Sequence, residues 1–204
     1  MTTTVHGRSL LDFGTDVARH LSLTQAGEWS AAWPAGEPSW CVYLTREDGA
    51  RIVLGHRDYQ KRFDASGGFP TTKGGNWYGP ARSEDRVSIT LADTKTPDQV
   101  ARDLARRLLP TYLPQYAQAI EGQQRDNAQA EAARNVALVL AELVGEKPSE
   151  YNGRGWRISR HGNGGPSVSV EVDPYQSARR VKVTLDDLTP EEARDVLQAL
   201  GVGG

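Results

Sequence analysis

The sequence predicts an α+β protein that contains a tandem internal repeat of an α-β-β-β-α unit. Each unit is expected to be a three-stranded antiparallel sheet with its helices packed on one face. Residues 86–109 and 180–200 share the order Arg-Val-x-(Ile/Val)-Thr-Leu-x-Asp, followed by Thr-Pro and an acidic helix start. Upstream of both copies lies a tryptophan-led hairpin pattern, preceded by an amphipathic helix pattern. The repeat therefore places unit 1 at 1–110 and unit 2 at 132–204.

Each unit is predicted to begin with a helix, because apolar residues recur at three- and four-residue spacing. Gly145 and Pro148 are expected to end the second of these helices. The two apolar stripes consist of Leu10, Phe13, Val17 and Leu21, and of Val136, Val139, Leu140, Leu143 and Val144.

Two hairpins should follow these helices, because strands of alternating polarity flank Asp-Gly and Asn-Gly turn signals. Trp40 and Trp156 open the hairpins at matching positions, so we expect both to anchor the core rather than to offer stacking surfaces. The expected strands are 40–46 with 51–54, and 156–160 with 167–172.

The repeated word itself predicts a strand followed by a capped helix. Residues 87–91 and 181–185 alternate between apolar and polar side chains, as half-buried strands do. Thr96 and Thr189 each precede a proline and stand three residues before Gln99 or Glu192. This spacing is typical of a capping box with proline at the first helical position.

The two halves differ at residues 63–85, a Gly- and Pro-rich segment that unit 2 lacks and that predicts a long loop insertion. Residues 111–131 between the units are polar and rich in alanine and glutamine. This composition favours a polar helical linker over a flexible one.

Composition narrows the class of protein. The 204 residues carry a formal net charge of −2, which gives no overall field toward nucleic acid or membrane. The single cysteine excludes an intramolecular disulfide. We expect no signal peptide, no membrane partner and a cytoplasmic location. The excess of arginine over lysine suggests a GC-rich bacterial genome.

Catalytic motifs are not convincing in this sequence. The four histidines lack metal-ligand spacing, and Cys41 next to a strand is expected to be a buried thiol. His56-Arg57-Asp58 copies a kinase catalytic loop, but the other kinase motifs are missing. We therefore predict no enzyme, no cofactor and no metal. An enzyme with a site assembled across the two units has only the repeated Asp-(Pro)-Tyr-Gln word in its favour.

Charge and aromatic residues give the functional prediction. Segments 51–82 and 151–182 each carry six basic and two acidic residues together with aromatic residues. Arginines contact phosphates and aromatic rings stack on bases, so the sequence predicts a non-catalytic nucleic-acid-binding accessory factor for DNA or RNA. The predicted nucleic-acid-binding residues are Arg57, Lys61, Arg62, Lys73, Trp77, Tyr78, Arg82, Arg157, Arg160, Arg179 and Arg180.

An alternative is a protein–protein interaction module, an adaptor or an inhibitor from a phage or plasmid, that inserts the loop at 63–85 into a partner.

The α-β-β-β-α order also resembles that of double-stranded RNA-binding domains, which carry a basic run at the start of their last helix. Here Asp98, Glu191 and Glu192 occupy those helix starts. RNA-duplex binding is therefore not carried over from the resemblance.

Overall fold

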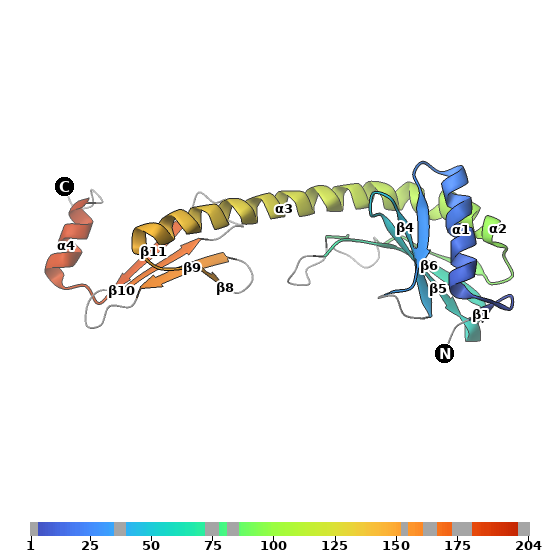
Figure 1. Ribbon diagram of the computed structural model, residues 1–204, viewed down its shortest axis with the longest axis horizontal. Helices are drawn as coiled ribbons and strands as arrows, with labels where there is room; N and C mark the ends of the chain where they lie inside the picture. The colour runs from blue at the N-terminus through green and yellow to red at the C-terminus, as the bar shows by residue number, and fades with distance from the viewer. Residues whose placement is uncertain are drawn as a thin grey trace. The chain divides into compact units, whose positions relative to one another are not determined.

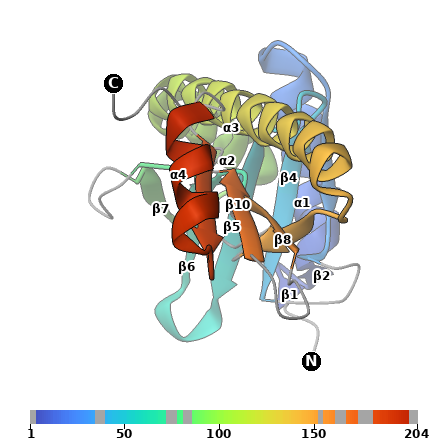
Figure 2. The same ribbon diagram turned by 90° about the vertical axis from the view of Figure 1, so that its left-hand side faces the viewer.

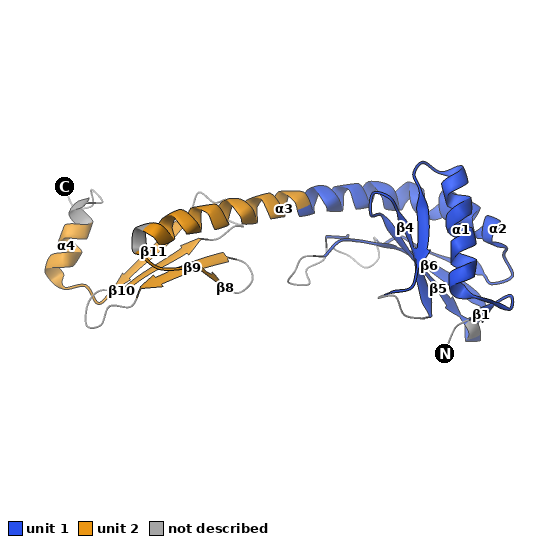
Figure 3. Ribbon diagram, viewed as in Figure 1, with its two compact units in different colours: residues 1–123 blue, residues 124–204 orange. Residues whose placement is uncertain are grey.

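The computed structural model describes residues 4–34, 40–71, 78–80, 86–151, 155–160, 167–172 and 181–199. Helices and antiparallel sheets are combined in it, in agreement with the α+β class. The chain divides into two compact units, residues 1–123 and 124–204 (Figures 1 and 3). The helix α3 (Leu109–Val144) crosses this boundary and includes all of the segment 111–131. Among the described residues, no helix is both long and apolar enough to span a membrane.

Unit 1 is built on a five-stranded antiparallel sheet with the order β3-β4-β5-β6-β7, where three strands were expected. The strands are β3 (Trp29–Ala32), β4 (Cys41–Arg46), β5 (Arg51–Arg57), β6 (Arg62–Gly68) and β7 (Ser88–Ala92). Around them lie β1 (Thr4–Val5), β2 (Arg8–Ser9), α1 (Leu10–Thr24), the 3-10 turn η2 (Asp58–Gln60), α2 (Pro97–Asp103) and the π-helical turn η4 (Leu104–Leu108).

The prediction of a loop over residues 63–85 is wrong at its start, because β6 occupies its first residues. Phe63 and Ala65 are buried, whereas Asp64 and Ser66, each one residue further on, are half-buried, which is the alternation of a strand. Phe63 pairs with His56 on β5 and with Leu91 on β7. The inserted segment therefore adds an inner strand, between β5 and β7, to the sheet of unit 1.

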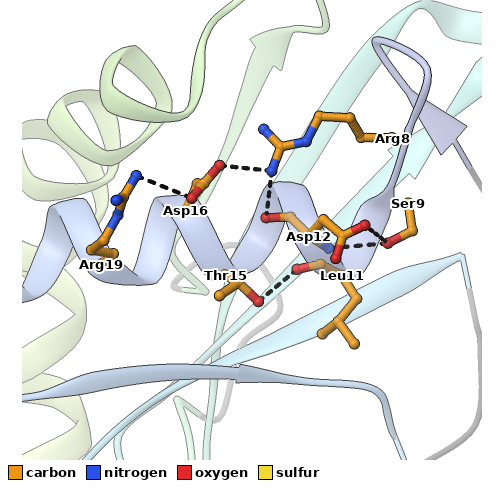
Figure 4. Close-up of polar contacts among 7 residues, drawn as sticks. All are labelled: Arg8, Ser9, Leu11, Asp12, Thr15, Asp16 and Arg19. Atoms are coloured by element: carbon orange, nitrogen blue, oxygen red, sulfur yellow. Dashed lines mark hydrogen bonds and ion pairs between the residues drawn. The ribbon is translucent and has the colours of Figure 1, made fainter.

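The start of α1 is fixed by a local polar network (Figure 4). Ser9 is the N-cap, and its Oγ accepts a hydrogen bond of 3.1 Å from the backbone N–H of Asp12. One turn further on, Asp16 binds Arg8 at 2.7 Å and Arg19 at 3.1 Å. The hydrogen bond from Arg8 is the main reason why the pKa of Asp16 is lowered.

The core of unit 1 lies between the sheet and its helices, and Figure 1 shows α1 and α2 on the same side of the strands. The predicted stripe of α1 is confirmed, since Leu10, Phe13, Val17 and Leu21 are all buried. Tyr112, from the first turn of α3, is also fully buried. These residues pack against the apolar side chains that alternate along β4, β5 and β6.

The second helical region of unit 1 begins at the predicted capping box. The backbone N–H of Thr96 donates to Oε1 of Gln99 at 3.1 Å, and Pro97 is the first residue of α2. Asp103, at the end of α2, accepts a hydrogen bond of 2.7 Å from Nζ of Lys95 and pairs with Arg106 at 3.1 Å. The hydrogen bond from Lys95 is the main cause of a lowered pKa at Asp103, whose side chain is 11% exposed.

We expect the substitution Lys95→Met to lower the free energy of unfolding by about 1 kcal/mol at pH 7. A carboxyl whose pKa is depressed in the folded state stabilises above its unfolded pKa, near 4, and loses this contribution as the pH falls through the folded value. The difference from the unmodified protein should therefore shrink below about pH 4. Urea unfolding at pH 7 and pH 3 measures it, with the exposed Lys147→Met as control. A difference that persists at pH 3 would contradict the ion-pair origin.

Unit 2 contains a four-stranded antiparallel sheet with the order β11-β10-β9-β8, again larger than the expected three strands. Its elements are β8 (Ser149–Tyr151), β9 (Gly155–Arg160), β10 (Ser167–Val172), β11 (Val181–Asp186) and α4 (Pro190–Ala199). The second half of α3 lies over one face of this sheet (Figures 1 and 2).

The face that α3 turns toward the sheet includes part of the predicted stripe, because Val136 and Leu140 are partly buried against the core of unit 2. Ala133, Ala137 and Ala141 are its buried residues, spaced one turn apart, and they pack with Ile158 and the valines of β10. Val139 belonged to the predicted stripe, but it is 60% exposed. The prediction is wrong at this position, because the buried row of α3 is formed by Ala133, Ala137 and Ala141 and Val139 lies outside it. The side chains of Leu143 and Val144 lie outside the described residues.

The end of α3 follows the predicted signal. Gly145 adopts a φ of +75°, a left-handed conformation that glycine reaches without steric cost. Its backbone N–H donates to the carbonyl of Ala141 at 2.9 Å. The helix therefore stops at the glycine that the sequence placed after its last apolar residue.

Candidate nucleic-acid interface

In the described part of unit 1, α1 and α2 lie on one face of the sheet, and no described helix covers the middle of the opposite face. Successive side chains of a strand point to opposite faces, so the buried residues of β4, β5 and β6 identify the core side. The residues between them lie on the other side, which we call the open face. The open face consists of Tyr43, Arg51, Val53, Arg57, Arg62, Asp64, Ser66 and Thr90, with Trp40 at its margin.

Two arginines of the open face are held by one carboxylate. Nε of Arg57 lies 2.8 Å from Oδ2 of Asp64, and Nε of Arg62 lies 3.4 Å from Oδ1 of the same residue. Arg57 and Arg62 are direct cross-strand partners of β5 and β6. Their side chains remain 42% and 40% exposed, although Nε of Arg62 is buried.

Tyr59 follows the end of β5 and extends this group. Its hydroxyl accepts a hydrogen bond of 3.4 Å from Nη1 of Arg57, and its side chain is 78% exposed. The hydroxyl of Tyr59, together with the carboxylate of Asp64, raises the pKa of Arg57. Arg57 is therefore oriented between the hydroxyl of Tyr59 and the carboxylate of Asp64.

A second basic and aromatic pair lies further along the same face. The guanidinium carbon of Arg51 is 4.7 Å from the ring centroid of Tyr43, within the range of a cation–π contact. Arg51 is exposed and Tyr43 is half-buried. A planar arginine stacked on an aromatic ring offers both a positive charge and a flat surface.

Trp40 lies against the backbone of Gly55, the residue of β5 nearest to its ring. A Cβ atom at position 55 would stand 2.4 Å from a ring carbon of Trp40, so the contact requires glycine there. The tryptophan is nevertheless 56% exposed. Our expectation that Trp40 anchors the core is wrong, because the ring precedes β4 and covers the open face. Trp156, its counterpart in the repeat, is partly buried against the core of unit 2.

Of the predicted binding residues in unit 1, the structure brings Arg57 and Arg62 together and places Lys61 beside them, exposed, in a turn with a φ of +50°. Tyr78 is half-buried, and a Cβ at Gly122 would stand 3.5 Å from its ring. The ring of Tyr78 therefore lies next to α3 at Gly122. Lys73, Trp77 and Arg82 lie outside the described residues, as does much of the segment proposed to bind a protein partner.

In unit 2 the described part of the predicted set is smaller. Arg157 on β9 forms an ion pair with Glu171 on β10, and Lys182 on β11 lies 3.6 Å from the same carboxylate. The pKa of Glu171 is lowered, first of all by the hydrogen bond from Arg157. Arg160, at the end of β9, is exposed. Arg179 and Arg180 lie outside the described residues.

The sequence-based list omitted Trp40, Tyr43, Arg51 and Tyr59, which now complete the basic and aromatic surface. The strand alternation contained the signal for Tyr43, because Val42 and Leu44 on either side of it are apolar. Arg51 could be found from its place opposite Thr45 once the hairpin register is set by the turn at Gly49.

The described residues contain no group of three or more histidine, cysteine or acidic side chains that could hold a metal ion. His56 is 5% exposed and lies on the core side, 3.5 Å from Asp93 and 5.1 Å from the ring of Phe63. Cys41 is buried, as predicted.

Comparison of the chain with protein family models, with curated proteins and with solved structures found no match.

Proposed function

We propose that this protein is a non-catalytic accessory factor that binds single-stranded nucleic acid on the open face of unit 1. The observation that carries the proposal is the exposure of Trp40, Tyr59 and three arginines on one face of one sheet. Aromatic rings stack on bases of any sequence, and arginines contact the phosphates between them.

The spacing of these side chains supports a nucleic-acid strand that runs across the β-sheet. Tyr43 on β4, Arg57 on β5 and Arg62 on β6 come from three consecutive strands. Adjacent strands lie about 4.8 Å apart, and Tyr43 pairs with Val53, four residues before Arg57 on β5, so these groups are distributed over roughly 16 Å. That span corresponds to several nucleotides of an extended backbone, and Arg51 continues the basic surface along β5. Asp64 neutralises part of the charge, which favours a modest affinity with fast exchange.

We further propose that the two units are diverged copies of one ancestral unit. Both contain the hairpin followed by the repeated strand word and a Thr-Pro-capped helix, as β4-β5 with β7 and α2, and as β9-β10 with β11 and α4. The strand β6 then counts as an insertion between the second and last strands of unit 1. Each copy also has one carboxylate among its basic residues, Asp64 in unit 1 and Glu171 in unit 2.

Fluorescence anisotropy with labelled 20-nucleotide oligonucleotides tests the proposal, with single-stranded DNA, single-stranded RNA and duplex DNA compared at two or more salt concentrations. Each phosphate contact on a single strand contributes about −0.7 to the slope of log affinity against log salt, so three arginines predict a slope of about −2. The single strands should bind more tightly than the duplex, because only unpaired bases can stack on Trp40.

The absence of binding to all three oligonucleotides at low salt would refute the proposed function. Tighter binding to the duplex would refute the stacking part alone. A companion variant, Arg57→Ala with Arg62→Ala, should reduce the slope by about 1.4, since two contacts are lost.

A further inference from the structure

One strand of unit 2 has an apolar face that the structure leaves uncovered. Val183 pairs with Val170 and Val181 pairs with Val172, and directly opposite residues of antiparallel strands share a face. Val170 and Val172 are 4% and 1% exposed and belong to the core beneath α3. Val181 and Val183 are 37% and 56% exposed, although they point to the same side. The core of unit 2 therefore ends before its edge strand.

The helix that follows this strand is amphipathic and well capped. The backbone N–H of Thr189 donates to Oε2 of Glu192 at 2.8 Å, and the N–H of Glu192 donates to Oγ1 of Thr189 at 3.3 Å. Ala193 and Val196 lie on one side of α4 and are half-buried. In the sequence, Leu197 and Leu200 continue this apolar stripe.

In unit 1, β7 corresponds to β11 and the α2–η4 region corresponds to α4, and the apolar surfaces of this strand and helical region belong to one core. Under the sequence repeat, Ile89 and Leu91 of β7 correspond to Val183 and Leu185, and they are 9% and 2% exposed. Leu104 corresponds to Leu197, and it is fully buried in the same core as β7. The final strand of unit 1 is therefore covered by the helix that follows it.

We propose that α4 docks on the core-side face of β11, formed by Val181, Val183 and Leu185, and completes the core of unit 2 next to α3. The occupant is the chain's own C-terminal helix. It would cover this face as the α2–η4 region covers β6 and β7. The proposal rests on the repeat and on side-chain exposure, so it is independent of nucleic-acid binding.

The connection favours docking within one chain. Only three residues separate Asp186 at the end of β11 from Pro190 at the start of α4, and four residues make the corresponding connection in unit 1. Three residues span about 10 Å when extended, so α4 begins close to the edge strand. Asp187, in this connection, adopts a left-handed φ of +61°. A connection of this length keeps the start of α4 within reach of β11.

Crosslinking of two introduced thiols tests the proposal directly. In a Cys41→Ala background, which removes the only native thiol, the pair Val183→Cys and Val196→Cys is treated with a short bismaleimide. The matched control is Lys182→Cys with Val196→Cys, because Lys182 is adjacent in sequence but lies on the opposite face of β11. We expect the first pair to give a crosslinked monomer at about fivefold higher yield or more than the control.

Equal yields from the two pairs would overturn the proposal. A crosslinked dimer in place of the monomer would also overturn it, and would assign the face to α4 of a second copy.

A labelling measurement keeps the proposal testable if the double variants fold poorly. The single variant Val183→Cys should react with a maleimide about tenfold faster once Ala193→Glu and Val196→Glu have made the stripe of α4 polar. The thiol of Lys182→Cys should react at the same rate with and without these changes. If the thiol at position 183 is as reactive as that at 182 in the otherwise unmodified chain, α4 does not cover β11.

Discussion

Replacing Trp40 with alanine is expected to weaken the binding of single-stranded oligonucleotides by about 1–3 kcal/mol, or roughly fivefold to 150-fold in Kd. The ring is 56% exposed and rests on the backbone of Gly55, so it is already placed for stacking before a ligand arrives. Preorganisation of this kind removes the cost of ordering a side chain on binding. Anisotropy titration at constant low salt measures the change.

The salt dependence separates this effect from a loss of charge. The indole ring is uncharged, so Trp40→Ala should leave the slope of log affinity against log salt unchanged, whereas arginine substitutions on the open face reduce it. Leu23→Ala is the matched control, because Leu23 is an exposed apolar residue of α1 in the same unit, at 77% exposure. Trp40→Phe should retain most of the affinity. Binding by Trp40→Ala equal to that of the parent would exclude the ring from the interface.

The features that the sequence predicted well have causes within a few residues. The capping boxes at Thr96 and Thr189 need only a threonine, a proline and an acceptor three residues on. The first hairpin turns at Gly49, whose φ of +88° only glycine adopts readily. The helix α3 ends at Gly145 for the same reason.

The features that were missed depend on partners distant in the chain. The strand β6 was hidden because its two glycines and its polar residues match loop composition, while its pairing with β5 and β7 is invisible locally. The exposure of Trp40 follows from its contact with Gly55, fifteen residues away. The core face of α3 was predicted correctly at Val136 and Leu140 but not at Val139, because its buried row is formed by alanines that the apolar stripe did not include.

The candidate site was predicted in outline but not in composition. Arg57, Lys61 and Arg62 were identified because charge density is readable from sequence. The aromatic half of the open face was not, because it requires knowing which side of the sheet is covered. Tyr43 lies between two buried residues of β4 and would have been assigned to the open face by strand alternation alone.

Substitution of Gly67 by alanine is expected to destabilise unit 1 by about 3 kcal/mol. A Cβ at this position would stand 2.2 Å from a ring carbon of Tyr112, much closer than van der Waals contact allows. The ring cannot move away easily, because Tyr112 is fully buried and its hydroxyl bridges two strands. It donates to the carbonyl of Gly68 at 2.7 Å and accepts from the N–H of Arg51 at 2.8 Å. Burial also raises the pKa of this hydroxyl.

Urea unfolding followed by tryptophan fluorescence measures the change, with Gly68→Ala as the matched control. A Cβ at Gly68 would meet its nearest neighbour, the carbonyl oxygen of Arg51, at 3.3 Å, so a much smaller loss is expected. The decisive comparison is a double-mutant cycle with Tyr112→Leu, since leucine can rotate away from the added methyl group. In that background the penalty of Gly67→Ala should fall by at least about half. If the penalty stays the same, its origin lies in the backbone of β6 and not in the packing of α3 against the sheet.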